Sequence, residues 1–493
     1  MKFWTEKKIL WAAMLIYIIF FGIFTSLRHY NFQTQAWDMG IFSQTLWNTT
    51  QGRFMTNALE GVKLESIKNH FGVHMSPFLI LLAPGYALFP TPYYLLIIQT
   101  IALALGALPI YLLSQKIIQK NSWAILIASA YLLYPPLHWA NNFDFHEITF
   151  FIPLMLAGVY FAEVQKWPWA FLFLALAAST KEDAILVVIF FGIYLMLKRK
   201  SGRSDSDESS DSKSGAESGN RKMGLAITTL ALIYFLISVL WVMPYYGSGI
   251  SRFTYRYAHL GSNPSEILTN AVWNPALLIN TVFTKIKMLY LAKLFLPLLL
   301  LPLFSWKAWF LLAPGMLENL LTGYAPQISG FYHYDSILIP GLFIGLIHSI
   351  KLFNDRFPDK EKKLWGALIA AVFLAFLIRS PLGFFYFPTD FFKSNPDWDT
   401  FRMMVNLVPN RASVAAQTNL VPHLINRERI YMLGTEPFPA DIALIDGADL
   451  SGFANENVFQ NYADSYANSG NYNILEIKNR YFVFSKKGIR LNQ

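Results

Sequence analysis

The sequence predicts a mainly α-helical, polytopic membrane protein, a bundle of about eleven membrane-spanning helices followed by a small α/β domain. Three observations support this fold class. The chain of 493 residues is 54% hydrophobic and only 14% charged, against about 25% charged residues in soluble domains. Long apolar runs recur between short polar segments along most of the chain. Aromatic residues reach 16%, and Trp and Tyr are enriched where helices end at lipid interfaces.

The basic residues, which give the chain a net charge of +9, do not indicate a nucleic-acid partner. They cluster in short loops between apolar runs, which is the pattern of membrane topology. The chain has no cysteine, and this excludes disulfides, thiolate catalysis and cysteine-ligated zinc. It also has no P-loop, G-x-G-x-x-G, H-E-x-x-H or G-x-S-x-G motif, so no familiar class of soluble enzyme is indicated.

The first predicted element is a membrane-spanning helix over 9–27. The basic segment 1–8 before it is like the start of a signal peptide, but no small-residue cleavage site follows, so we expect a retained span. A shorter run over 77–90 is interrupted by proline and glycine and is expected to be interfacial or re-entrant. The other runs long enough, or nearly long enough, to cross a bilayer cover 93–115, 123–137, 149–164, 168–180, 184–198, 223–245, 288–304, 308–322, 336–350 and 364–379.

The distribution of Lys and Arg orients these spans. With the N-terminus in the cytoplasm, every loop on the cytoplasmic side is basic, as the positive-inside rule requires. Counting 77–90 as a full span would place the Lys-rich loop 351–363 outside. The outer segments are then 28–92, 138–148, 181–183, 246–287, 323–335 and 380–493.

Composition divides the chain into four regions. The segment 201–220 is rich in Ser and Asp, has low complexity and offers no apolar residues to bury. It is predicted to be part of a disordered cytoplasmic linker. Strand-like runs over 412–416, 442–446 and 481–485, with a helical pattern over 399–408, predict an outer α/β domain. No internal repeat is present, which weakens the case for a transporter built from two related halves. The regions are an N-terminal transmembrane module over 1–200 with a long outer loop over 28–92, the linker over 201–222, a second transmembrane module over 223–380 and the extracytoplasmic domain over 381–493.

Five polar clusters gather on the outer side of the predicted bundle, in four of the outer segments. The run 168–180 would give a helix of about 20 Å, against a hydrocarbon core of about 30 Å. Lys181 and its two acidic neighbours should therefore lie below the outer surface, where ionisable groups usually line a polar cavity. The clusters are Trp37–Gly40, His70–Pro77, Asp144–Glu147, Lys181–Asp183 and His333–Asp335.

Each cluster also has a purely structural interpretation. His70 and His74 would share one face of a helix, which suits a metal, but hydrogen bonding or interfacial placement also explains such a pair. Asp144 and Glu147 would form either a two-carboxylate site or a polar loop. The other structural interpretations are a turn capped by Asp38, a self-neutralising cluster of Lys181, Glu182 and Asp183, and an interfacial anchor at His333–Tyr334.

In their order and shared membrane side, these clusters resemble those of the prokaryotic membrane family DUF2079, which is similar to the GT-C superfamily of membrane glycosyltransferases. The resemblance covers most of the chain apart from the linker, and it includes a first span followed by a long outer loop with an aspartate near its start. The matching stretches are Trp37–Gln44, His70–Pro77, Phe143–Glu147, Lys181–Asp183 and His333–Tyr334, with 412–417 and 426–431 in the C-terminal part.

The resemblance implies an enzyme that transfers a sugar from a polyprenyl-phosphate donor to a glycan, lipid or protein acceptor on the outer face of the cell membrane. Asp38 would be the general base on an acceptor hydroxyl, or a ligand of a possible divalent metal. Many GT-C enzymes carry two adjacent acidic residues in the first loop, whereas Asp38 stands alone, so metal use stays open. Lys181 would offset charge on the donor phosphate. The candidate catalytic residues are Asp38, Asp144, Glu147 and Glu182, and the candidate substrate-binding residues are His70, His74, His146, Lys181, Asp183, Arg252, Arg256, His333 and Tyr334.

Two other functions would also fit an outward-facing cavity. A transporter or flippase for a lipid-linked or small substrate should carry polar residues through to the inner face, whereas the clusters stop at the outer side. A non-catalytic scaffold would tolerate substitution of Asp38 and Lys181. The lipid bilayer is a partner in each of these hypotheses.

Overall fold

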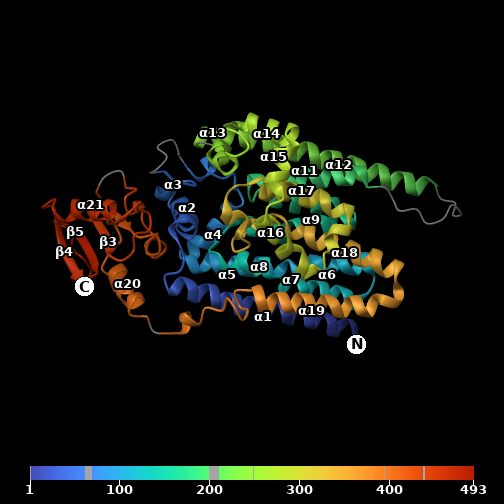
Figure 1. Cartoon of the computed structure of the whole chain (residues 1–493), viewed down its shortest axis with the longest axis horizontal. Helices are drawn as coiled ribbons and strands as arrows, with labels where there is room; N and C mark the ends of the chain where they lie inside the picture. Colours follow the sequence, from blue (N-terminus) through green and yellow to red (C-terminus); the bar gives the residue numbers. More distant parts are fainter. Residues whose placement is uncertain are drawn as a thin grey trace.

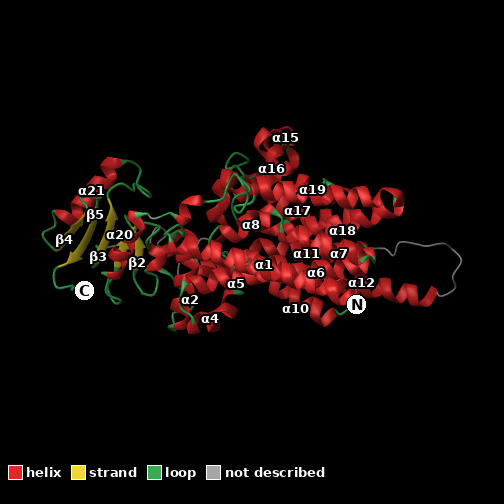
Figure 2. Cartoon of the chain, turned by 90° about the horizontal axis from the view of Figure 1, so that it is seen from below, coloured by secondary structure: helices red, strands yellow, loops and turns green. Residues whose placement is uncertain are grey.

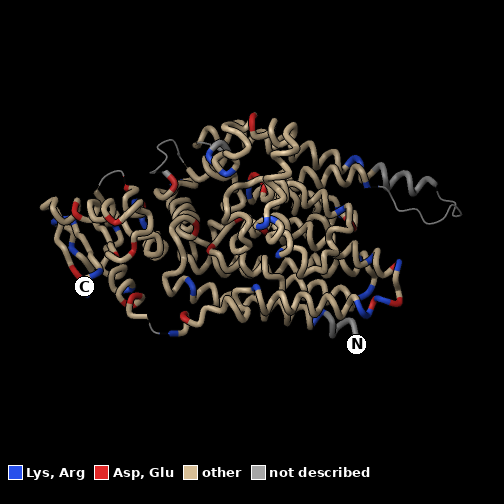
Figure 3. The backbone as a smooth tube through the Cα atoms, viewed as in Figure 1, with Lys and Arg blue, Asp and Glu red and all other residues tan. Residues whose placement is uncertain are grey.

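The computed structural model describes residues 2–61, 69–198, 210–247, 249–393, 395–436 and 439–492. A long helical bundle forms most of the molecule, and a small sheet domain made by the C-terminal residues lies at one end of it (Figures 1 and 2). Charged residues are sparse along the helices of the bundle (Figure 3), as expected for helices that contact each other and lipid. The mainly α-helical class with a small C-terminal α/β unit is thus confirmed.

The helices of the bundle follow the apolar runs of the sequence. The first half contains α1 (Lys2–Tyr30), α5 (Pro92–Leu105), α6 (Ala107–Ile118), α7 (Asn121–Leu132), α9 (Phe151–Glu163), α10 (Trp167–Ala178) and α11 (Glu182–Leu197). The second half contains α12 (Ser210–Ile237), α13 (Met243–Tyr246), α16 (Lys285–Phe295), α17 (Trp306–Leu321), α18 (Ile339–Arg356) and α19 (Glu361–Arg379). One continuous core of buried side chains joins both halves.

Among the described residues, three helical stretches are long and apolar enough to cross a membrane: Lys7–Tyr30, Pro92–Ile118 and Gly219–Tyr246. The other predicted spans are shorter or interrupted helices, so the count of about eleven spans stays a prediction. The run 288–304 is not one helix, because α16 ends at Phe295 and two 3₁₀ turns (Leu296–Leu298 and Leu301–Phe304) follow, each with a proline that removes a backbone donor.

Two other sequence predictions concern the segments that flank the spans. The run 77–90 forms the short apolar helix α4 (Leu79–Leu88) with Pro84 inside it, in keeping with a segment too short to span. In the predicted linker 201–222, residues 201–209 lie outside the described part of the chain, whereas helix α12 already begins at Ser210. The prediction of a disordered linker therefore does not hold for its second half, where the backbone continues the next helix.

Short helical elements connect the bundle on the side of the sheet domain. The loop after α1 contains a π-helical turn, η1 (Ala36–Gly40), then α2 (Ile41–Thr50), α3 (Ala58–Gly61) and η2 (His70–Gly72). The remaining short elements between the helices of the bundle are α8 (Pro135–Asn142), η3 (Glu147–Phe150), η5 (Gly249–Tyr257), α14 (Pro264–Trp273), α15 (Pro275–Val282), η8 (Ala325–Ile328), η9 (His333–Ile337) and η11 (Thr389–Phe392).

The C-terminal domain is a five-stranded mixed sheet with two helices. Its strand order is β2-β1-β3-β5-β4, in which β2, β1 and β3 are parallel and the last two pairs are antiparallel. The elements are α20 (Pro396–Asn406), β1 (Val414–Ala416), η12 (Val421–His423), β2 (Ile430–Met432), β3 (Ile442–Asp446), α21 (Glu456–Ala467), β4 (Tyr472–Ile477) and β5 (Tyr481–Lys486).

The two faces of this sheet are covered differently. One face packs under α21, with Ala415, Ala443 and Phe484 buried there. The other face shares a single apolar core with the first outer loop, because Val414 and Ile442 of the sheet and residues 36–59 of the loop belong to the same buried cluster. The sheet domain is therefore fixed directly against the loop that contains Asp38.

Candidate functional site

A cavity of about 490 Å³ opens between loops that connect the helices of the bundle. Side chains from several distant segments of the chain form its wall, as the sequence predicted for the outer polar clusters. Among the sequence-predicted site residues, those that line the cavity are Asp38, His70, His74, His146, Glu147, Lys181, Arg252, Arg256, His333 and Tyr334. Asp144, Glu182 and Asp183 do not line it. Glu182 and Asp183 pair with the lining residues His74 and Lys181, and Asp144 pairs with Arg28.

Asp38 and His146 form a pair on the cavity wall. Asp38 lies in the π-helical turn η1, a type of turn that is frequent at functional sites. His146 Nε2 lies 3.0 Å from Asp38 Oδ1. The backbone N–H of His146 donates to Gln99 Oε1 over 2.8 Å, and its ring stacks on His333 with 3.6 Å between the centroids. The imidazole is therefore held in place from two sides and can keep the Asp38 carboxylate directed into the cavity.

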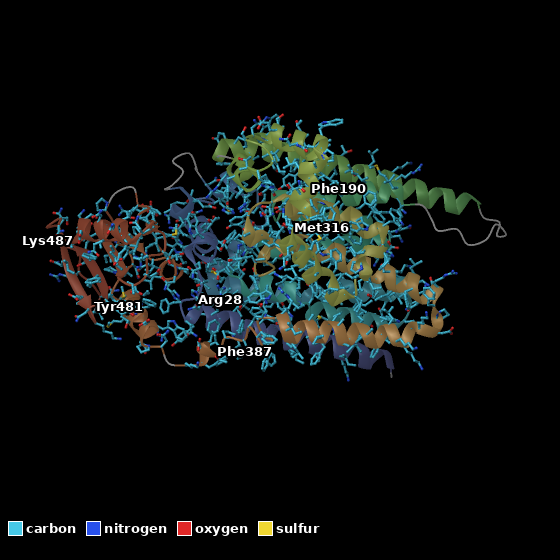
Figure 4. The ribbon with its side chains drawn as sticks, in the orientation of Figure 1. Arg28, Phe190, Met316, Phe387, Tyr481 and Lys487 are labelled. Atoms are coloured by element: carbon cyan, nitrogen blue, oxygen red, sulfur yellow. The ribbon has the colours of Figure 1, made fainter. Side chains whose placement is uncertain are left out.

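Asp144 lies behind this pair. Its side chain is completely buried and accepts hydrogen bonds from Arg28 Nη1 over 2.6 Å and from the backbone N–H of Gln35 over 2.8 Å. Arg28, at the end of α1 nearer the sheet domain (Figure 4), also donates to the carbonyl of Asn142 over 2.6 Å. The ion pair thus joins the start of the first outer loop to the loop that contains His146.

His70 pairs with Glu60, a carboxylate that the sequence analysis missed. His70 Nδ1 lies 3.0 Å from Glu60 Oε2, and both side chains are buried. Burial alone would lower the pKa of His70, but the Glu60 carboxylate outweighs it and raises the pKa of His70 above its ordinary value. Burial alone would raise the pKa of Glu60, but His70 outweighs it and lowers that pKa. Both pKa shifts favour the charged forms of the pair, an imidazolium beside a carboxylate.

This pairing predicts a pH dependence of stability. A histidine with a raised folded-state pKa stabilises the fold below its unfolded value of 6.5, and this contribution is lost as the pH rises through the raised pKa. Between about pH 6 and about pH 9, the melting temperature of the wild-type protein should therefore fall more than that of His70→Gln. The measurement is thermal unfolding in detergent, with Glu60→Gln as the matched variant. Equal slopes for wild type and His70→Gln would contradict the assignment.

His74 and Lys181 are each held by an acidic neighbour. His74 Nδ1 lies 2.8 Å from Glu182 Oε1, and the backbone N–H of Met75 donates to Glu182 Oε2 over 3.0 Å. Burial alone would raise the pKa of Glu182, but His74 and then Lys181 outweigh it and lower the pKa to about 2. Lys181 Nζ lies 3.2 Å from Asp183 Oδ2. Glu182 and Asp183 thus hold cavity residues in position.

Two arginines from η5 complete the cationic part of the wall. Arg252 Nη1 is buried and has no hydrogen-bond partner among the residues that the structure describes. The Arg256 guanidinium is surrounded by aromatic rings, with its Cζ 4.9 Å from the ring centroids of Phe253 and Tyr324 and 5.5 Å from that of Tyr334. Cation–π contacts of this kind fix the guanidinium without neutralising its charge.

Several buried polar atoms on cavity-lining residues have no partner within the described protein. Buried polar groups are usually hydrogen-bonded, so such atoms indicate a bound ligand or water. These atoms are His70 Nε2, His146 Nδ1, Glu147 Oε2, Arg252 Nη1 and His333 Nδ1. A polar ligand that carries both hydrogen-bond donors and an anionic group would satisfy them.

The structure differs from the metal hypothesis for His70 and His74. Residues His70–Gly72 form only a 3₁₀ turn, and the two rings are paired with different carboxylates, so the histidines do not share a helix face. Within the described ranges, no group of three His, Asp or Glu side chains is arranged to hold a metal ion. A divalent metal at this site stays a prediction.

The aromatic lining and Glu60 are the features that the sequence analysis did not identify. Glu60 follows Asn57 by three positions, and Asn57 Oδ1 accepts from the Glu60 N–H over 2.8 Å, a capping pair that could have signalled a short helix there. The aromatic residues gave no such signal, because their spacing has no period. They are Phe253, Tyr255, Tyr324 and Tyr332, whereas the lining residues Trp37, Phe42 and Phe143 belong to stretches that the sequence analysis did name.

The comparison with solved structures shows that the chain has a known fold. The crystal structure of ArnT from Cupriavidus metallidurans, bound to undecaprenyl phosphate, aligns with a TM-score of 0.54 and 11% identity over 96% of this chain and 97% of that one. The archaeal oligosaccharyltransferase AglB from Archaeoglobus fulgidus, in complex with an inhibitory peptide and a dolichol-phosphate, gives a TM-score of 0.49 and 10% identity over 99% of this chain and 75% of that one. A search of curated protein sequences finds no match.

The ArnT alignment extends over nearly the whole of both chains, so the two proteins share one fold. The family model described as predicted membrane protein (DUF2079) matches residues 28–479, which include the whole cavity and most of the sheet domain. The chain therefore belongs to the DUF2079 family of predicted membrane proteins.

Proposed function

We propose that this protein is a glycosyltransferase that moves a sugar from a polyprenyl-phosphate donor to an acceptor on the outer face of the membrane. One observation carries the proposal: a single cavity contains the Asp38–His146 pair and the three cations Lys181, Arg252 and Arg256. A base and a cluster of cations in one cavity match the two needs of the reaction, since one group must accept a proton and others must stabilise a leaving phosphate.

In the proposed reaction the acceptor hydroxyl transfers its proton to the Asp38 carboxylate while its oxygen attacks the anomeric carbon of the sugar. The bond between that carbon and the phosphate oxygen breaks, and its electron pair stays on the phosphate. Polyprenyl phosphate leaves with one more negative charge than the donor had. Hydrogen bonding from His146 Nε2 to Asp38 Oδ1 over 3.0 Å orients the carboxylate for this step.

The cations would bind the phosphate and offset the charge that develops on it. Lys181 is buried, and Arg252 Nη1 has no acceptor within the described part of the chain, so both can form short charge-assisted hydrogen bonds with phosphate oxygens. Arg256 is fixed by its aromatic neighbours and needs little reorganisation on binding. Preorganised charge in a cavity with limited access to water is usually the largest single contribution to catalysis.

The remaining candidates receive different roles in this proposal. Glu147 lines the cavity with a free Oε2 and would accept hydrogen bonds from hydroxyl groups of the sugar. Asp144, Glu182 and Asp183, which the sequence suggested as catalytic or substrate-binding, act through the residues that they hold: Arg28, His74 and Lys181. ArnT shares the fold and has been crystallised with a polyprenyl phosphate, which supports the proposed class of donor.

Binding of polyprenyl phosphate tests the donor half of the proposal. In Arg252→Gln the affinity should fall by about 10- to 100-fold, since one charge-assisted interaction contributes about 1.5–3 kcal/mol. The measurement is a titration of the purified protein in nanodiscs with a labelled polyprenyl phosphate. Arg356→Gln, at the C-terminal end of α18, is the matched control, because Arg356 does not line the cavity.

Equal affinity in wild type and Arg252→Gln would contradict the placement of the phosphate. A chelator included in the same titration decides whether a divalent metal contributes to binding. A transporter of lipid-linked substrates would also bind polyprenyl phosphate. Sugar transfer distinguishes the enzyme from the transporter, because only an enzyme performs it.

A further inference from the structure

Asp38 lies in the turn η1 (Ala36–Gly40), which we call the Asp38 turn. The first backbone N–H groups of this turn donate hydrogen bonds to side chains from distant parts of the chain. The first N–H groups of a helical turn have no acceptor within the turn. Here Gln35 N donates to Asp144 Oδ2 over 2.8 Å, and Ala36 N donates to Thr418 Oγ1 over 3.0 Å. One cap comes from the loop that contains His146, and the other comes from the C-terminal sheet domain.

The last residue of the Asp38 turn touches the same domain. A methyl group at Gly40 would lie 3.2 Å from Val421 Cγ1 and 3.0 Å from Leu59 Cδ1, so a neighbour would have to move. Val421 is fully buried and follows Thr418 by three positions. Glycine at position 40 is therefore what permits the close approach of the turn and the domain.

Other contacts fix the domain against this part of the outer loop. The Gln44 side chain, four residues beyond the turn, donates to the carbonyl oxygens of Arg427 over 3.0 Å and Glu428 over 3.2 Å. At the end of α1, the ring of His29 stacks on His423 with 4.2 Å between the centroids and 5° between the planes. Because these contacts flank the turn on both sides in sequence, a shift of the domain would move the turn with it.

We infer that the C-terminal domain is a positioning part of the active site, in which Thr418 and Val421 hold the Asp38 turn in register with His146. The inference rests on the proposed function, because it gives the Asp38 carboxylate a catalytic task. Neither residue lines the cavity, so both act through the turn and not on substrate. Orientation matters at this scale, since a displacement of about 1 Å can lower a rate by about 10²-fold.

The first test removes the hydroxyl cap. Thr418→Val should lower kcat by about 10-fold or more while the Kd for polyprenyl phosphate stays unchanged, and Thr418→Ser should keep both values within about 2-fold of wild type. In the same variants, hydrogen exchange of residues 36–42 should be faster in Thr418→Val only. Thr435→Val is the matched control, because its buried hydroxyl donates to the Met432 carbonyl within the domain.

The second test uses the steric contact. Gly40→Ala should lower kcat by about 10-fold or more, and adding Val421→Ala should restore part of the loss by making room for the new methyl group. Recovery in the double variant shows that the loss comes from the contact with the domain and not from a defect of folding.

Three results would overturn the inference. If the hydrogen exchange of residues 36–42 and the kcat of Thr418→Val both equal the wild-type values, the hydroxyl does not position the turn. If kcat and the affinity for polyprenyl phosphate both fall in Thr418→Val, and both also fall in Thr435→Val, the cause is general destabilisation of the domain. If Thr418→Val exchanges faster but wild-type protein transfers no sugar, the proposed function fails, and the catalytic meaning of the contact fails with it.

Discussion

Asp38→Asn is expected to reduce kcat for sugar transfer by about 10²- to 10⁴-fold, the range of a general base. Asparagine has nearly the same shape and can still contact His146 Nε2 at the position of Oδ1, which lies 3.0 Å away. It cannot accept a proton from the acceptor hydroxyl. The measurement is single-turnover transfer with saturating lipid-linked donor, together with the Kd of polyprenyl phosphate, which should stay near the wild-type value.

Asp397→Asn is a useful control for this prediction. Asp397 lies in α20 of the C-terminal domain, where it accepts a hydrogen bond from the hydroxyl of Tyr481 over 2.5 Å, and it is not among the residues that line the cavity. The same chemical change should there leave kcat near wild type. Full activity of Asp38→Asn would remove Asp38 from the chemistry and would mean that another group accepts the proton.

Arg28→Gln is expected to have the largest effect on stability. It leaves the fully buried carboxylate of Asp144 without its cation, and breaking a buried ion pair by removing one partner costs about 3–5 kcal/mol. Burial already raises the pKa of Asp144 above its ordinary value, and Arg28 opposes this rise. The free energy of unfolding, measured by denaturant titration in detergent, should therefore fall by that amount, and Asp144→Asn in the same chain should recover part of it.

Arg402→Gln is the matched control for Arg28→Gln. Arg402 also pairs with an aspartate at 2.6 Å, but its partner Asp399 is largely exposed, and exposed pairs contribute about 0–1 kcal/mol. A loss of stability in Arg28→Gln no greater than in Arg402→Gln would contradict the structural role assigned to the buried pair.

The helical elements could be predicted from the sequence because lipid-facing and buried helices both need long apolar runs. The interruption of the run 288–304 was also visible in principle, since Pro297 and Pro302 each remove a backbone donor. Strand β2, with three residues, is too short to show a period of two, and β4 is an edge strand whose middle residues are exposed. Neither strand carries the alternation that a sequence pattern needs.

The cavity could be predicted as a meeting of outer polar clusters, but the direction of individual side chains could not. Asp144 was expected to face substrate with Glu147, yet its backbone has a positive φ of 40°, unusual for a residue other than glycine, and its carboxylate points to Arg28. The caps that Thr418 and Asp144 supply to the Asp38 turn depend on contacts between segments far apart in the chain. Such contacts leave no local pattern in one sequence.

The most direct test of the central claim is sugar transfer in proteoliposomes of known orientation. Purified protein is given a panel of radiolabelled polyprenyl-phosphate sugars and a cell-envelope extract as the source of acceptor. The donor is supplied either on the side of the C-terminal domain or on the opposite side. The account predicts labelled acceptor and released polyprenyl phosphate in equal amounts, only when the donor is on the side of the C-terminal domain. Movement of intact donor across the bilayer without transfer of the sugar would contradict it and identify a transporter.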